Sequence, residues 1–74
     1  MDDNYLSARK LLGERVRQRR ALLGISQEEL AFRAEVDRTY VSQIERGIGN
    51  PSLQVLLRLA KVLQTPFAQL VEGM

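Results

Sequence analysis

Apolar residues recur every three or four positions along most of the chain, which is the spacing of an α-helix rather than of a strand. In the first such run, residues 6–23, Leu12, Val16 and Arg20 share one face, and Gly24 follows as a stop. No stretch alternates with the period of two that is typical of a half-buried strand. The pattern therefore predicts an all-α fold.

Residues 26–47, reading SQEELAFRAEVDRTYVSQIERG, have the pattern of two short amphipathic helices joined by a tight turn. Ser26 is placed to cap the first helix, and Glu29 three residues later would complete a capping box. Asp37 is the expected cap of the second helix, and Gly47 its stop.

Two further helices are predicted after residue 47. Ser52 follows a turn and is placed to cap a fourth helix. Thr65 and Pro66 favour the start of a short fifth helix, with proline at its first position. Together the five apolar stripes predict one core, consisting of Leu12, Val16, Ile25, Leu30, Ala31, Ala34, Val36, Val41, Ile44, Leu53, Leu56, Ala60, Leu63 and Phe67.

The helix after Asp37 has two different faces when its residues are turned by about 100° each. Its inner face consists of Tyr40, Val41, Ile44 and Glu45. Its polar face consists of Arg38, Thr39, Ser42, Gln43 and Arg46. Gln can bond adenine through two hydrogen bonds, Arg can do the same with guanine, and Ser or Thr suits either base or a phosphate. In an isolated helix such a polar face is more often simply solvated. Whether this one binds DNA has to be judged from the sequence around it.

The segments SQEELA, DRTYVSQIERG and GNPSL, at these intervals, resemble the Cro/repressor-type (XRE-like) helix-turn-helix family of bacterial and phage regulators. The match runs from about Leu12 to Leu70. The resemblance implies a compact five-helix Cro/repressor-like domain that regulates transcription by binding double-stranded DNA, and it leaves activator and repressor roles open. We divide the chain into residues 1–10, an N-terminal extension and start of the first helix, and residues 11–72, the DNA-binding domain. The RTYVSQIERG-like helix is similar to that of restriction-modification controller proteins, although stand-alone repressors and antitoxins share the pattern.

The resemblance places the third helix, residues 38–46, in the major groove. The residues expected to read bases are Arg38, Thr39, Ser42 and Gln43. The residues expected to contact phosphates are Gln27, Arg46, Asn50, Ser52, Arg17 and Tyr40. Simpler roles stay open for four of these residues: an exposed helix position for Gln27, a turn position for Asn50, a cap for Ser52, and ring packing for Tyr40.

Four residues depart from the simple division into core and surface. Arg20 and Glu45 are charged at core-facing positions, and we expect an ion pair, because a lone buried charge is costly; the resemblance implies the same pair. Glu35 stands where the family usually has glycine, so we expect a left-handed backbone there with about 1 kcal/mol of strain. Arg19 stands where similar sequences often carry an apolar residue, and it either extends a basic patch or lies along the surface.

Composition narrows the function classes. The chain of 74 residues has no Cys and no His, which removes disulfides, the common zinc sites and thiol or imidazole catalysis. We therefore expect no enzymatic activity, no metal and no cofactor. The sequence has no apolar run of membrane-spanning length and no signal-peptide pattern. A cytoplasmic protein without a membrane partner or a small-molecule ligand is expected.

The net charge is only +2, but it is unevenly distributed. Residues 14–20 carry four Arg against one Glu, residues 26–37 carry one Arg against four acids, and residues 38–61 carry four bases against one Glu. Arginine, whose planar group suits phosphates and guanine, supplies most of the positive charge. The small net charge predicts a weak non-specific attraction to DNA.

A single recognition helix contacts too few base pairs to select one site in a genome. We therefore expect a homodimer on a palindromic operator, with its two recognition helices about 34 Å apart. Apolar residues left after the core is filled lie late in the chain. The predicted interface consists of Leu59, Val62, Leu70 and Val71. The rival interpretation is an antitoxin-type module that binds a toxin and also regulates its own operon.

Overall fold

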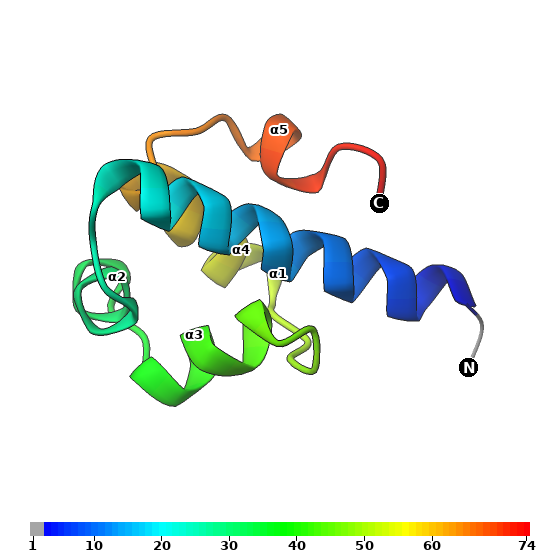
Figure 1. Ribbon diagram of the computed structural model, residues 1–74, viewed down its shortest axis with the longest axis horizontal. Helices are drawn as coiled ribbons and strands as arrows, with labels where there is room; N and C mark the ends of the chain where they lie inside the picture. The colour runs from blue at the N-terminus through cyan, green and yellow to red at the C-terminus, as the bar shows by residue number, and fades with distance from the viewer. Residues whose placement is uncertain (1–2) are drawn as a thin grey trace.

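The computed structural model describes residues 3–74, and within them the chain forms five helices and no strand (Figure 1). The helices are α1 (Asp3–Leu23), α2 (Gln27–Ala34), α3 (Arg38–Glu45), α4 (Leu53–Val62) and α5 (Phe67–Val71). In Figure 1, α1 crosses the molecule, with α2 and α3 on one side of it and α5 on the other. The predicted all-α, five-helix fold is confirmed for this part of the chain. None of these helices is both long and apolar enough to cross a membrane.

The first helix begins earlier than the apolar pattern indicates, at Asp3 rather than near Leu6. The guanidinium of Arg9 lies over the ring of Tyr5, 4.6 Å from the ring centre. Pairs four residues apart stabilise the helical turns between them, and a cation over an aromatic ring is a favourable pair. This contact stabilises the turn between Tyr5 and Arg9, and an apolar repeat does not reveal it.

The helix caps form largely where the sequence places them. The hydroxyl oxygen of Ser26 accepts a hydrogen bond of 3.0 Å from the backbone N–H of Glu29. The other half of the expected capping box is absent, because the carboxylate of Glu29 binds Arg33 Nε at 2.6 Å instead. Asp37 precedes α3, but its side chain makes no capping hydrogen bond. Pro66 stands just before α5 rather than at its first helical position.

The turn between α2 and α3 depends on one left-handed residue. Glu35 has φ 60° and ψ 44°, as expected for the position where glycine is usual. Its backbone N–H donates to Phe32 O at 3.2 Å, and that of Val36 donates to Ala31 O at 3.0 Å. These bonds close α2 and turn the chain towards α3.

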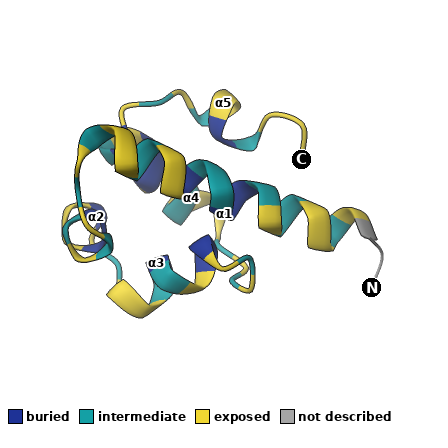
Figure 2. Ribbon diagram, viewed as in Figure 1, coloured by how far each residue is buried: buried dark blue, intermediate teal, exposed yellow. Residues whose placement is uncertain are grey.

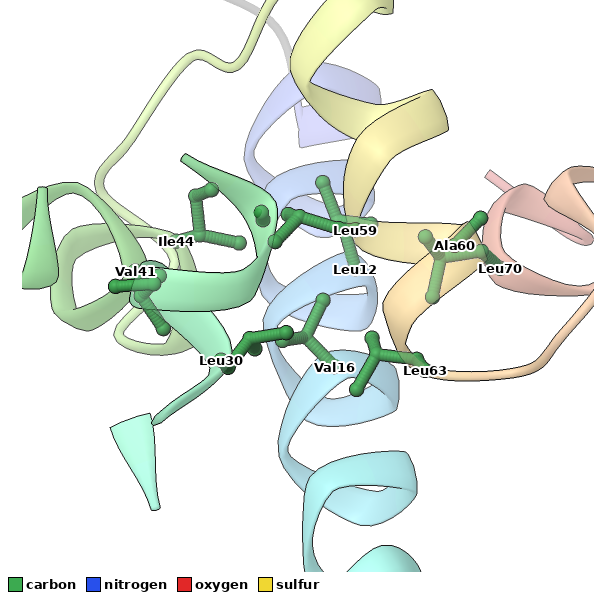
Figure 3. Close-up of a cluster of buried hydrophobic side chains, with 11 residues drawn as sticks. Leu12, Val16, Leu30, Val41, Ile44, Leu59, Ala60, Leu63 and Leu70 are labelled. Atoms are coloured by element: carbon green, nitrogen blue, oxygen red, sulfur yellow. The ribbon is translucent and has the colours of Figure 1, made fainter. Parts of the chain in front are cut away.

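All five helices contribute side chains to one core (Figure 3). The buried apolar residues are Leu12, Val16, Leu30, Ala31, Ala34, Val41, Ile44, Leu59, Ala60, Leu63 and Leu70. The expected core residues Ile25, Val36, Leu56 and Phe67 are partly buried against this cluster.

Three predictions about the late helices are wrong. Leu53, expected in the core, is 62% exposed. Leu59 and Leu70, assigned to the dimer interface, are fully buried within a single chain and are unavailable to a second copy. The leucine-rich α4 offers two apolar stripes, and α5 returns alongside α1, which brings Leu70 into the core (Figure 1). Of the predicted interface, Val62 and Val71 stay half-buried.

α1 and α3 cross at Gly13, a residue that the sequence pattern does not single out. A Cβ atom at this position would lie 2.4 Å from Ile44 O and 2.8 Å from Glu45 O. Only glycine lets the two backbones approach so closely. The crossing brings the end of α3 against α1 and leaves the first turn of α3 at the surface.

Substituting Gly13 with Ala tests this crossing. Helix propensity alone would make alanine more stable by about 1 kcal/mol. The clash with backbone oxygens that cannot move aside should instead lower the free energy of unfolding by about 3 kcal/mol. Denaturant unfolding measures the difference, with Gln18→Ala on the exposed side of α1 as the control. A variant as stable as the parent protein would show that the crossing is not as tight as described.

Candidate nucleic-acid interface

The polar face of α3 is open to solvent, and its opposite face is buried (Figure 2). Arg38, Thr39 and Gln43 are exposed and Ser42 is half-buried. The buried residues of the helix are Val41, Ile44 and Glu45. The structure therefore brings the four expected base-reading residues to one accessible surface, with Arg46 exposed directly after the helix.

The end of α3 is held by the ion pair expected from the sequence. Arg20 Nε binds Glu45 Oε2 at 2.7 Å, and Arg20 Nη2 binds Glu45 Oε1 at 3.0 Å. The third guanidinium nitrogen, Nη1, donates to Ile25 O at 3.1 Å. The side chain of Glu45 is only 3% exposed and that of Arg20 is 20% exposed. A two-pronged pair of this kind fixes direction as well as distance, so α1, α3 and the turn before α2 are locked together.

Gln27 joins the same cluster from the start of α2. Its Nε2 donates to Glu45 Oε1 at 3.0 Å. An amide nitrogen carries two hydrogens, so this bond leaves a second donor on Gln27. The sequence predicted a phosphate contact for this residue and missed its bond to Glu45.

The cluster keeps Glu45 ionised. Burial by itself would raise the pKa of this carboxyl. Hydrogen bonds from Arg20 and Gln27, together with the positive charges of Arg20 and Arg17, outweigh burial and lower the pKa below its usual range. The hydrogen bond to Glu45 raises the pKa of Arg20 in turn, against the opposing effect of burial.

An open hollow of about 520 Å³ lies between the first turns of α2 and α3. Its lining residues are Arg20, Ser26, Gln27, Glu28 and Arg38. The beginning of a helix attracts anions, because unpaired N–H groups and the helix dipole are directed there. With Arg38 and the second amide hydrogen of Gln27 beside it, the hollow has the chemistry to accept a backbone phosphate of DNA.

The loop before α4 is tied to α3 by Tyr40. Its hydroxyl oxygen accepts a 3.4 Å hydrogen bond from Ser52 N. The hydroxyl of Ser52 accepts one of 3.2 Å from Val55 N, so Ser52 caps α4 as the sequence allowed. Asn50, two residues before Ser52, is exposed.

Two arginines of α1 that the sequence placed in a basic stretch bind backbone carbonyls. Arg17 Nη1 donates to Glu45 O at 3.3 Å, at the end of α3. Arg19 donates to Leu63 O from Nε and Nη2, at 3.2 and 3.0 Å, and to Gln64 O at 3.1 Å. Arg19 therefore holds the carbonyl end of α4, a role that was not expected from the sequence.

Two more arginines of α1, neither of them indicated by local sequence patterns, act in the same way. Arg9 Nη1 donates to Ile48 O at 3.4 Å, in the loop after α3. Arg15 Nη1 donates to Gln69 O at 2.9 Å, in α5. Their spacing along α1 gives no sign of these partners, which belong to segments distant in the sequence. Much of the positive charge of α1 thus binds the protein's own backbone.

The profile of the helix-turn-helix family HTH_3 matches residues 16–70, which include α2, α3 and the surface described above. The chain belongs to this helix-turn-helix family. It is 46% identical over 56 residues to control protein C.BamHI of Bacillus amyloliquefaciens, covering 74% of this chain and 69% of that protein. It is 36% identical over 67 residues to control protein C.SmaI of Serratia marcescens, covering 90% and 80%.

Solved structures agree with this membership. The restriction-modification controller protein C.AhdI of Aeromonas hydrophila superposes with a TM-score of 0.83 at 41% identity, covering 86% of this chain and 97% of that one. The N-terminal DNA-binding domain of SinR from Bacillus subtilis gives 0.82 at 37% identity, covering 86% and 94%. This helix-turn-helix protein is thus a transcriptional regulator related to controller proteins.

Removing Arg20 tests the ion pair. Arg20→Ala leaves a buried carboxylate without its main partner, so the free energy of unfolding at pH 7 should fall by about 3 kcal/mol. The pKa of Glu45 is lowered on folding, so the contribution of the pair is complete above the ordinary carboxyl pKa of about 4.3 and is lost as the pH falls through the lower folded value. The difference between parent and variant should therefore narrow in acid.

Denaturant unfolding between pH 7 and pH 3 measures this difference. Arg38→Ala, which removes an exposed arginine of the same charge, is the control and should leave the unfolding midpoint in place. An unchanged midpoint for Arg20→Ala would contradict the role given to the pair.

Proposed function

We propose that two copies of this chain bind a near-palindromic DNA duplex, each with α3 in the major groove, and regulate the transcription of a restriction-modification operon. The observation that carries the proposal is a polar, exposed face on a helix whose other face is fixed in the core. A helix held in this way presents side chains to base edges with little freedom of movement. The similarity to control proteins supports the choice of operon.

Arg38, Thr39, Ser42 and Gln43 are the proposed base readers. Arg38 and Gln43 carry the paired groups that suit guanine and adenine, and the hydroxyls of Thr39 and Ser42 can both donate and accept. Within residues 3–74 no hydrogen bond or ion pair engages these four side chains, so their polar groups are available to DNA.

The proposed phosphate contacts surround this face. These contacts would be made by the side chains of Gln27, Arg46, Asn50, Ser52, Arg17 and Tyr40. Arg46 and Asn50 are exposed and have no other partner among residues 3–74. Gln27, Arg17 and Tyr40 each bind an atom of α3 or of the loop after it and would meet phosphate with their remaining donors. Such contacts set the position of the protein on DNA without reading its sequence.

The proposed homodimer uses the exposed face of α4. Leu53 and Leu57 lie four residues apart, on one side of the helix, with exposed fractions of 62% and 49%. Large apolar side chains left in water on one face favour association with another protein surface. In this proposed interface Leu53 and Leu57 take the place of Leu59 and Leu70, which are buried in the core of a single chain.

Alanine substitutions separate base reading from phosphate binding. On a duplex selected by the protein from a random library, Arg38→Ala and Gln43→Ala should each cost about 1–3 kcal/mol and relax the base preference at one position. Gln27→Ala should weaken the selected and the random duplex equally. Fluorescence anisotropy at fixed salt measures both affinities, and the exposed Arg58→Ala on α4 is the charge-matched control.

Equal losses on selected and random duplexes would remove Arg38 and Gln43 from the base-reading set. Failure of the library to yield any preferred sequence would contradict the proposed function as a whole.

Sedimentation tests the dimer. The parent protein should sediment as a dimer at micromolar concentration, and Leu53→Glu with Leu57→Glu should convert it to a folded monomer. Leu22→Glu, which changes a leucine 74% exposed on α1, should leave the dimer intact. A parent protein that is monomeric at this concentration and still binds the selected duplex would refute the α4 interface.

A further inference from the structure

A second hollow, of about 400 Å³, lies between the C-terminal ends of α2 and α4. It shares no residue with the hollow at Gln27 and Arg38, and no residue of α3 lines it. Three cations and one carboxylate stand around it, namely Arg33, Arg58, Lys61 and Glu35. Ala34 and Val62 add apolar surface.

Two of the three cations have no partner in the described part of the protein. No hydrogen bond or ion pair engages the side chain of Arg58 or Lys61 within residues 3–74. The usual task of a cation at the end of a helix is to bind the last carbonyls. Arg19 already binds Leu63 O and Gln64 O after α4, so Arg58 and Lys61 are not needed to bind these carbonyls. The charges of Arg58 and Lys61 are therefore available to something outside the chain.

A left-handed residue borders the hollow on each side, one after α2 and one after α4. Glu35 has φ 60° and Gln64 has φ 55°, and these are the two non-glycine residues with positive φ among residues 3–74. Both line the hollow. Each is the left-handed residue that closes a helix: after α4, Gln64 N–H donates to Lys61 O at 3.2 Å and Thr65 N–H donates to Ala60 O at 3.1 Å, as the bonds at Glu35 do after α2. The turns that end α2 and α4 therefore form two borders of the hollow.

The lining indicates the chemistry of the ligand. Guanidinium and ammonium groups bind phosphate oxygens through charge-assisted hydrogen bonds. The carboxylate of Glu35 accepts hydrogen bonds from hydroxyl or amino groups, which an inorganic anion lacks and an organic phosphate ester often carries. The volume lies within the range of small-ligand sites, and Ala34 and Val62 offer apolar contact.

We propose that this hollow binds a phosphate monoester of about nucleotide size, separately from DNA. The proposal departs from the expectation, based on the sequence, that the chain has no small-molecule ligand. It does not depend on the DNA-binding role of α3, because the residues involved are all outside that helix.

Titration with AMP, followed by amide chemical shifts in NMR, tests the site. Saturable shifts should appear at Ala34, Val62 and Gln64. The double variant Arg58→Gln with Lys61→Gln should weaken AMP binding at least about tenfold. The single variant Lys61→Gln should weaken AMP binding several-fold, whereas its matched control Lys10→Gln, at an exposed position outside both hollows, should change the affinity by less than about twofold. Inorganic phosphate should bind more weakly than AMP.

Several results would overturn the proposal. Equal weakening by Lys61→Gln and Lys10→Gln would show that AMP responds only to the overall charge of the protein. Shifts confined to Gln27 and Arg38 would place the ligand in the other hollow. Inorganic phosphate that binds as tightly as AMP would exclude an ester-specific site, and shifts that do not saturate by about 10 mM would exclude a site altogether.

Discussion

The charge of Glu45 in the interior is the constraint on which the rest of the structure depends. An ionised carboxylate with only 3% of its side chain exposed is tolerated only when donors surround it. Arg20 supplies two of them from α1 and Gln27 supplies a third from α2. Because Glu45 is the last residue of α3, satisfying this one charge sets the direction of α3 against both neighbouring helices. The polar face of α3 is consequently held out towards solvent.

The arginines of α1 extend the same principle to the whole domain. Arg9, Arg15, Arg17 and Arg19 each donate to a backbone carbonyl in a different segment, from the loop after α3 to α5. A small core buries limited apolar area, and charge-assisted bonds to carbonyls at helix ends add attachments that the core cannot provide. Because these arginines are bound to carbonyls, much of the positive charge of a chain with net charge +2 is used within the protein. Arg38 and Arg46, by contrast, are left unpaired at the surface.

Much of the fold could be predicted from local patterns, because these depend on neighbours in the sequence. Apolar spacing located the five helices, and Ser26 and Ser52 cap α2 and α4 where predicted. The left-handed turn at Glu35 followed from the resemblance to a family with glycine there. The Arg20–Glu45 pair could also be predicted, since two opposite charges on the inner faces of helices have few other partners to bind. The exposure of the polar face of α3 followed from the same periodicity.

By itself, the sequence determined the five helices, the serine caps of α2 and α4 and the polar face of α3, since each is a property of residues within a few positions of one another. Only the tertiary structure decided which face of the leucine-rich α4 is buried, that Leu59 and Leu70 belong to the core, and that Gly13 is required at a helix crossing. It also assigned carbonyl partners to the arginines of α1 and gathered Arg33, Arg58 and Lys61 around one hollow. The reason is physical: periodicity shows that a face is apolar or charged, whereas its partner depends on how distant segments pack against each other.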